Sequence, residues 1–172
     1  MQKTLVLTVV GRDRTGLVES LARLIADAGG NWLESRMCRL GGEFAGILRA
    51  SVPEEREDSL AGSLEGLKSE GLTVVIRHDA VQPSAQPART ATLSLVGHDR
   101  PGIIYQISAA LAHQNVSFEE LTTEFSSAPM SGDMIFKASA RLQIPPACSV
   151  SELQKELEEL GSELMVDIRF VA

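Results

Sequence analysis

Two six-residue stretches, GRDRTG at residues 11–16 and GHDRPG at residues 97–102, carry residue types that could bind a ligand. Each follows an apolar run and precedes residues with a helical period, so its backbone N–H groups include free donors at the positive end of a helix dipole. Such donors attract an anion or a carboxylate without any basic side chain. A phosphate loop is excluded, because Leu17 and Val18 stand where lysine and serine or threonine are required.

A purely structural role for these two turns stays open. Asp13 and Asp99 could cap the helix that follows, and Pro101 suits the first turn of a helix. Gly16 and Gly102 could simply let strand and helix pack closely. Finding the turn twice decides little between the two roles, because duplication copies structural turns as well.

The other reactive side chains form no catalytic or metal-binding pattern. Cys38 and Cys148 are far apart and have no metal-type spacing, and the three histidines are scattered. Glu119 and Glu120 are adjacent in a predicted strand, so we expect them to point to opposite faces and not to act as a carboxylate pair. We therefore expect no catalytic residue, no metal and no cofactor.

The chain repeats itself. When residue 11 is placed on residue 97, the match continues beyond the turn, with Leu21 on Ile107 and Trp32 on Phe118. A shared apolar phase over a strand, a turn and a helix indicates an internal duplication. We expect the two aromatic residues to lie in the cores and not to stack on a ligand.

Each half presents the same order of elements: strand, helix, two strands, helix, strand. In the first half these are strand 5–10, helix 15–29, strands 31–40 and 43–52 around a Gly41-Gly42 turn, a helix through Leu60, Leu64 and Leu67 that ends near Gly71, and strand 72–78.

In the second half, Ser149 and Glu152 predict a capping box at the start of the second helix, and Gly161 predicts its end. The order βαββαβ with one-sided helices predicts an α+β fold. We expect two ferredoxin-like domains, each a four-stranded antiparallel sheet with helices on one face. Their predicted bounds are 1–78 and 91–172, joined by a proline-containing linker at 79–90.

The sheet face without helices should expose apolar residues. These are Val6 and Val10, or Leu5, Leu7 and Val9, depending on the register of the first strand. Pairing of the two halves, and then of two chains, would cover them, so we expect a homodimer.

The composition excludes several classes of protein. A formal charge of −7 and the lack of a basic run argue against direct binding of nucleic acid. No stretch approaches the ~20 apolar residues of a membrane-spanning helix, and the N-terminus becomes charged too early for a signal peptide. We expect a cytoplasmic protein without membrane contact.

The pattern D-R-[TP]-G-[LI]-[VI], followed by Gly30-Asn31-Trp32-Leu33, resembles the amino-acid-sensing ACT domain, present twice. Two such halves with a proline-containing linker and no attached enzyme are most similar to the glycine cleavage system transcriptional repressor family. The resemblance implies a non-catalytic regulatory module that binds a small amino acid, with glycine as one candidate, where two ACT-like domains meet. It also implies a DNA-binding transcription factor as the partner, because the chain has no helix-turn-helix or basic strip.

The resemblance also implies where the ligand would bind. The loop backbone around Gly16 or Gly102 would hold it, with help from Asp13 or Asp99 and from a side chain at the start of the second strand. Thr15 replaces the usual proline in the first half, and Ser117 replaces the usual asparagine in the second, so Asn31 favours the first half. The candidate residues are Asp13, Arg14, Thr15, Gly16, Leu17 and Asn31, and Asp99, Arg100, Pro101, Gly102, Ile103 and Ser117.

Two alternatives remain open. One is an enzyme of small-molecule metabolism on a duplicated ferredoxin-like scaffold, because this fold hosts many functions. The other is a regulatory subunit of a metabolic enzyme.

Overall fold

The computed structural model describes residues 1–79, 89–127 and 133–172. The chain divides into two compact units, Met1–Gln82 (unit 1) and Pro83–Ala172 (unit 2). Residues 80–88 of the predicted linker at 79–90 lie outside the described residues.

Both units have the predicted βαββαβ order, which confirms the α+β class and the ferredoxin-like plan. Unit 1 consists of β1 (Gln2–Arg12), α1 (Leu17–Asp27), β2 (Asn31–Leu40), β3 (Glu43–Pro53), the 3₁₀ turn η1 (Glu54–Arg56), α2 (Glu57–Gly66), the 3₁₀ turn η2 (Leu67–Glu70) and β4 (Leu72–His78). Unit 2 consists of β5 (Arg89–His98), α3 (Ile103–His113), β6 (Ser117–Ser127), β7 (Met134–Ile144), α4 (Val150–Leu164) and β8 (Val166–Val171).

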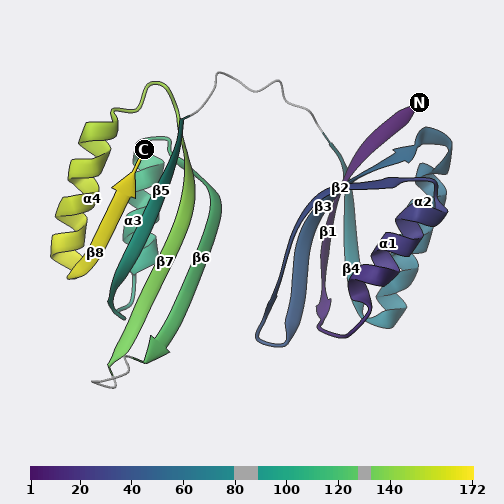
Figure 1. Ribbon diagram of the computed structural model, residues 1–172, viewed down its shortest axis with the longest axis horizontal. Coiled ribbons are helices and arrows are strands. Elements are labelled where there is room, and N and C mark those ends of the chain that lie inside the picture. Colours follow the sequence, from purple (N-terminus) through teal and green to yellow (C-terminus); the bar gives the residue numbers. More distant parts are fainter. Residues whose placement is uncertain (80–88, 128–132) are drawn as a thin grey trace. The chain divides into compact units, whose positions relative to one another are not determined.

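Each sheet is antiparallel, with strand order β2-β3-β1-β4 in unit 1 and β6-β7-β5-β8 in unit 2. The helices of each unit cover one face of its sheet (Figure 1). Leu5, Leu7 and Val9 face these helices and are fully buried, which places Val6 and Val10 on the other face. The predicted core residues are all buried: Leu21, Ile25, Leu60, Leu64, Ile107, Leu111, Leu153 and Leu157.

The sequence also located the turns of unit 1 correctly. Gly41 and Gly42 join β2 to β3 with φ angles of 59° and 86°, and Gly71 ends η2 with a φ of 84°. These left-handed conformations are the ones that favour glycine. Trp32 and Phe118 pack at the edges of the two cores, as predicted.

The prediction that Gly161 ends the last helix is wrong. Ser149 caps α4 as expected, since its hydroxyl accepts from the backbone N–H of Glu152, but the helix continues through Gly161 to Leu164. A Cβ at Gly161 would lie 3.0 Å from the carbonyl oxygen of Val166. This glycine therefore allows α4 to approach β8 closely, and Met165, with a φ of 55°, ends the helix.

The prediction that Glu119 and Glu120 point apart is also wrong. The register of β6 against β7 shifts between Phe118 and Glu120, so the simple alternation of faces is broken there. Both carboxylates contact Arg141, at 3.1 Å for Glu119 and 2.7 Å for Glu120.

The same bulge and ion pair occur in unit 1, where the register shifts between Trp32 and Glu34. Glu34 lies 2.8 Å from Arg49 across the strands, and in unit 2 Glu120 lies 2.7 Å from Arg141. Arg49 also contacts Asp79 at 2.6 Å, and hydrogen bonds to the two carboxylates raise the pKa of Arg49. The duplication thus extends to a detail that the sequence comparison did not resolve.

Candidate functional site

The two repeated loops occupy equivalent places in their units. Each connects the end of the first strand to the first helix and is attached to the neighbouring hairpin through one backbone hydrogen bond. Asp13 donates its N–H to the carbonyl of Gly42, and Asp99 donates its N–H to the carbonyl of Met134, each at 3.0 Å. The loops therefore lie at the hairpin end of each sheet.

The first glycine of each motif has a packing role. A Cβ at Gly11 would collide with the carbonyl oxygen of Gly71, and a Cβ at Gly97 would collide with the side chain of Val166. Both glycines thus permit the end of the first strand to lie against the start of the last strand. This close approach explains why Gly11 and Gly97 are glycines without any need for a ligand.

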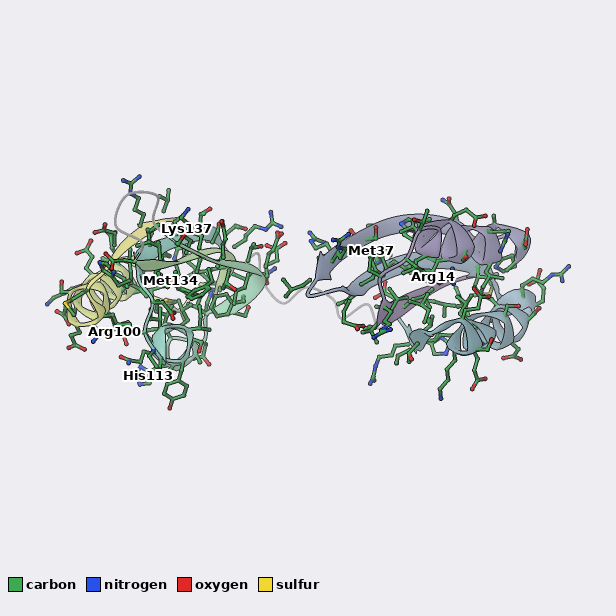
Figure 2. The ribbon with its side chains drawn as sticks, turned by 90° about the horizontal axis from the view of Figure 1, so that it is seen from below. Arg14, Met37, Arg100, His113, Met134 and Lys137 are labelled. Atoms are coloured by element: carbon green, nitrogen blue, oxygen red, sulfur yellow. The ribbon has the colours of Figure 1, made fainter. Side chains whose placement is uncertain are left out.

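The motif arginines, which are labelled in Figure 2, attach each loop to the end of the second helix of its unit through hydrogen bonds. Arg14 donates to the Glu70 carboxylate at 2.6 Å, and Arg100 donates to the backbone carbonyl of Leu164 at 3.0 Å. Glu70 and Leu164 are the last residues of η2 and α4, where a cation is favourable because of the helix dipole. Arg14 and Arg100 therefore have a structural task in both units.

The second glycine of each motif begins the helix in a left-handed conformation. Gly16 and Gly102 have φ angles of 90° and 92°, and no described side chain caps either helix. Asp13 and Asp99 are thus not the caps that a purely structural role would require. A Cβ at Gly16 would meet nothing within 4 Å, so close packing does not explain this glycine either.

Uncapped helix starts leave backbone donors free. The first three N–H groups of a helix have no partner within the helix, and here these belong to residues 17–19 and 103–105. Leu17 and Ile103 have buried side chains, so these two candidate residues offer only their backbone. Thr15 and Pro101 are exposed beside them.

The motif aspartates differ between the units. The Asp13 carboxylate lies 3.2 Å from the guanidinium of Arg39 in β2, whereas Asp99 forms no ion pair with any described residue. Arg39 pairs across the strands with Phe44, and at the equivalent pair in unit 2 Phe125 faces Phe136. Arg39 was missed by the sequence analysis, since only the fold brings it to the loop.

Asn31 and Ser117 do not join the loops of their own units. Asn31 and Thr4 both pair with Ser51, at the end of the sheet opposite to Arg12. Thr4 and Arg12 are eight residues apart in one strand, which corresponds to about 26 Å. Ser117 is separated from the second loop in the same way, because it pairs with Gln143 opposite Thr90. A site that combines loop and strand start needs two units.

Apart from the two loops, unit 2 has an open groove of about 660 Å³ between the end of β5, the C-terminal turn of α4 and the start of β8, and this groove includes His98 and Asp167. No cluster of three or more potential metal ligands occurs within the described ranges. None of the described helices is long and apolar enough to span a membrane.

Comparison with known proteins agrees with this geometry. The family model of the ACT domain matches residues 3–77, which is nearly the whole described part of unit 1. The UPF0237 protein MK1213 of Methanopyrus kandleri is 32% identical over 78 residues, which cover 45% of this chain and 81% of that protein. The chain belongs to the ACT domain family. Unit 2, with the same fold, makes it a tandem ACT protein.

Two further proteins match along almost the entire tandem ACT chain. The glycine cleavage system transcriptional repressor of Escherichia coli is 22% identical over 164 residues, covering 95% of this chain and 86% of that protein. The crystal structure of an unknown protein from Galdieria sulphuraria is 28% identical with a TM-score of 0.84, covering 99% of this chain and 98% of the other. Both matches therefore span unit 1 and unit 2 of this chain.

Proposed function

We propose that this tandem ACT protein is a non-catalytic regulator that binds a small amino acid between two ACT units. The observation that carries the proposal is the uncapped helix start at Gly16 and again at Gly102, each with an aspartate in the preceding loop. Membership of the ACT domain family and the full-length similarity to a protein named as a transcriptional repressor support a regulatory role.

The two ends of an amino acid match the two kinds of group at the loop. The free N–H groups at the start of the helix would donate to the ligand carboxylate. Asp13 or Asp99 would accept from the ligand ammonium, and in unit 1 the ligand would compete with Arg39 for this carboxylate. The backbone at Gly16 is unobstructed, so a ligand can approach it.

The third group of the site would come from a second unit. β2 and β6 are edge strands, each paired on one side only within the described residues. Antiparallel pairing of two such edges would place the start of one strand, with Asn31 or Ser117, opposite the hairpin end and loop of the other unit. We favour a site with Asn31, because its amide both donates and accepts whereas Ser117 offers a shorter hydroxyl.

A thermal-shift screen of the full chain against the twenty amino acids tests ligand binding. A ligand at a hundred times its dissociation constant should stabilise the chain by about 2.7 kcal/mol and raise the melting temperature by roughly 5 to 10 °C. Mass spectrometry of the same mixtures should show no turnover. An unchanged transition with every amino acid, or turnover of any of them, would contradict the proposal.

Matched variants identify which residues hold the ligand. Asn31→Ala should abolish the shift, while Ser117→Ala, its equivalent in unit 2, should leave it. Asp13→Asn should weaken the shift and Asp99→Asn should not. The reverse pattern would assign the ligand to the groups of unit 2 at these positions.

We further propose that the chain acts through a DNA-binding transcription factor, since its formal charge of −7 does not suit direct contact with DNA. A pull-down from native lysate with the tagged full chain identifies the partner. Recovery of a transcription factor supports this role, and recovery of a metabolic enzyme would replace it with that of a regulatory subunit.

A further inference from the structure

One sheet face of unit 1 is not covered by its helices (Figure 1), and exposed apolar side chains lie at its centre. We call it the open face of unit 1, and it consists of the four rows of cross-strand neighbours that contain Val6, Thr8, Val10 and Arg12. Val10, Ile47 and Val75 are 46%, 53% and 47% exposed. Ile47 and Val75 flank Thr8 in one row across three neighbouring strands, so the exposed side chains form one patch.

The equivalent face of unit 2 has a different chemistry. Ser94 takes the place of Thr8, and its cross-strand neighbours are Ser139 and Arg169 instead of Ile47 and Val75. Hydroxyl and guanidinium groups are compatible with water, whereas a patch of exposed valine and isoleucine favours burial against another surface. Two copies of one fold thus differ at the same face, and the apolar copy is the one suited to association.

We propose that two copies of the chain associate through the open face of unit 1, related by a two-fold axis that runs parallel to the strands. Such an axis reverses the strand order of one copy over the other, so that β2 faces β4 of the partner and β3 faces β1 of the partner. Each row of cross-strand neighbours then lies over the same row of the second copy. The two sheets stack as in a β-sandwich.

Four charged residues of the open face fit this arrangement, while Arg36 lies opposite the partner's Val75. Glu34 and Arg77 belong to the row that contains Val6, at opposite edges of the sheet, so Glu34 faces the partner's Arg77. Glu43 and Arg12 are neighbours in another row, and Glu43 faces the partner's Arg12. The two-fold axis repeats both contacts. Arg12, Glu43 and Arg77 form no ion pair with any described residue, so they are available to the partner.

The size of the face is sufficient for a modest interface. Four rows along the strands and four strands across give roughly 27 Å by 19 Å, or about 500 Å² per copy. The total of about 1,000 Å² is close to the smallest area that a specific protein–protein interface buries. Apolar contacts at the centre are Ala45 with the partner's Val10 and Ile47 with the partner's Thr8.

This dimer does not depend on the proposed amino-acid site, because Asp13, Gly16 and the helix starts lie outside the open face, to which the first loop contributes only Arg12. It is tested by the mass of the full chain in light scattering, without any ligand. The wild type should have twice the mass of the 18.5 kDa chain. Val10→Glu should reduce the mass to that of one chain, because each copy would bring a charge into the apolar centre.

Val96→Glu is the matched control, since Val96 holds the equivalent position in unit 2 and is 43% exposed against 46% for Val10. This variant should remain a dimer. A monomeric wild type across micromolar concentrations, a dimeric Val10→Glu variant, or a monomeric Val96→Glu variant would overturn the proposal. Circular dichroism of each variant checks that the fold is retained.

A charge exchange tests the two-fold arrangement even if Val10→Glu unfolds. Arg77→Glu alone sets like charges opposite Glu34 twice per dimer, and Glu34→Arg alone sets them opposite Arg77. Each variant should dimerise about 30-fold more weakly than the wild type. Mixing the two variants should restore dimers of mixed composition, because every contact is then between opposite charges. Failure of the mixture to form dimers, or unchanged dimerisation of the single variants, would refute this geometry.

Discussion

Gly16 and Gly62 provide a matched test of why the loop needs a glycine. Both lie in unit 1, and a Cβ at either position would meet no atom within 4 Å. Gly16 has a φ of 90°, whereas Gly62 lies inside α2 without a positive φ. Replacement by alanine therefore adds no collision at either site, and the backbone conformation alone distinguishes them.

The structure gives opposite signs for the two changes in the free energy of unfolding. Gly16→Ala forces an L-residue into a left-handed conformation, which costs about 1–2 kcal/mol. Gly62→Ala removes the helix penalty of glycine and should stabilise by about 0.5–1 kcal/mol. For a unit of about 80 residues, 1 kcal/mol corresponds to roughly 4–8 °C in melting temperature.

Differential scanning calorimetry of the full chain measures both variants. Gly16→Ala should lower the melting temperature of unit 1 by about 4–16 °C, and Gly62→Ala should raise it by about 2–8 °C. Gly11→Ala should be worse than either, because its Cβ meets the backbone of Gly71. A neutral or stabilising Gly16→Ala variant would refute the argument, and a loss equal to that of Gly11→Ala would indicate close packing at Gly16.

Other expected outcomes concern Met165 and the two cysteines. Met165→Gly should raise the melting temperature of unit 2 by about 2–8 °C in calorimetry, because Met165 has a φ of 55° where unit 1 has Gly71. Cys38 is exposed in one copy but lies on the open face, so a thiol reagent should label it rapidly in the monomeric Val10→Glu variant and more slowly in the wild-type dimer. The buried Cys148 should be labelled only after unfolding in urea. Burial raises the pKa of the Cys148 thiol. Its contribution to stability is complete below the thiol pKa of the unfolded chain and is lost as the pH rises above it, so alkaline melting curves should lose this pH dependence in Cys148→Ala.

The sequence was sufficient for the features that depend on local pattern. Leu21 and Ile25 have the helical period of a buried face, and Gly41-Gly42 predicts the hairpin. Gly161 was misassigned because a glycine that ends a helix and one that allows close packing look alike until β8 is placed beside α4. Glu119 was misassigned because the bulge arises from the register of β6 against β7.

In the candidate site, too, the local features were predicted from the sequence and the long-range contacts were not. The loops at Gly16 and Gly102 were found from sequence, because a strand, a turn and a helix are local. The separation of Asn31 from its own loop follows from sheet topology, and the contact of Asp13 with Arg39 joins the first loop to strand β2. No period or motif in the sequence reports such contacts.

The two motif arginines differ in how well their contacts can survive mutation. Arg14 depends on the carboxylate of Glu70, so a single substitution at that position removes its partner. Arg100 uses the main-chain carbonyl of residue 164, which every amino acid supplies. The second copy of the loop can therefore keep its anchor while the helix end beneath it diverges freely in sequence, and the first copy cannot.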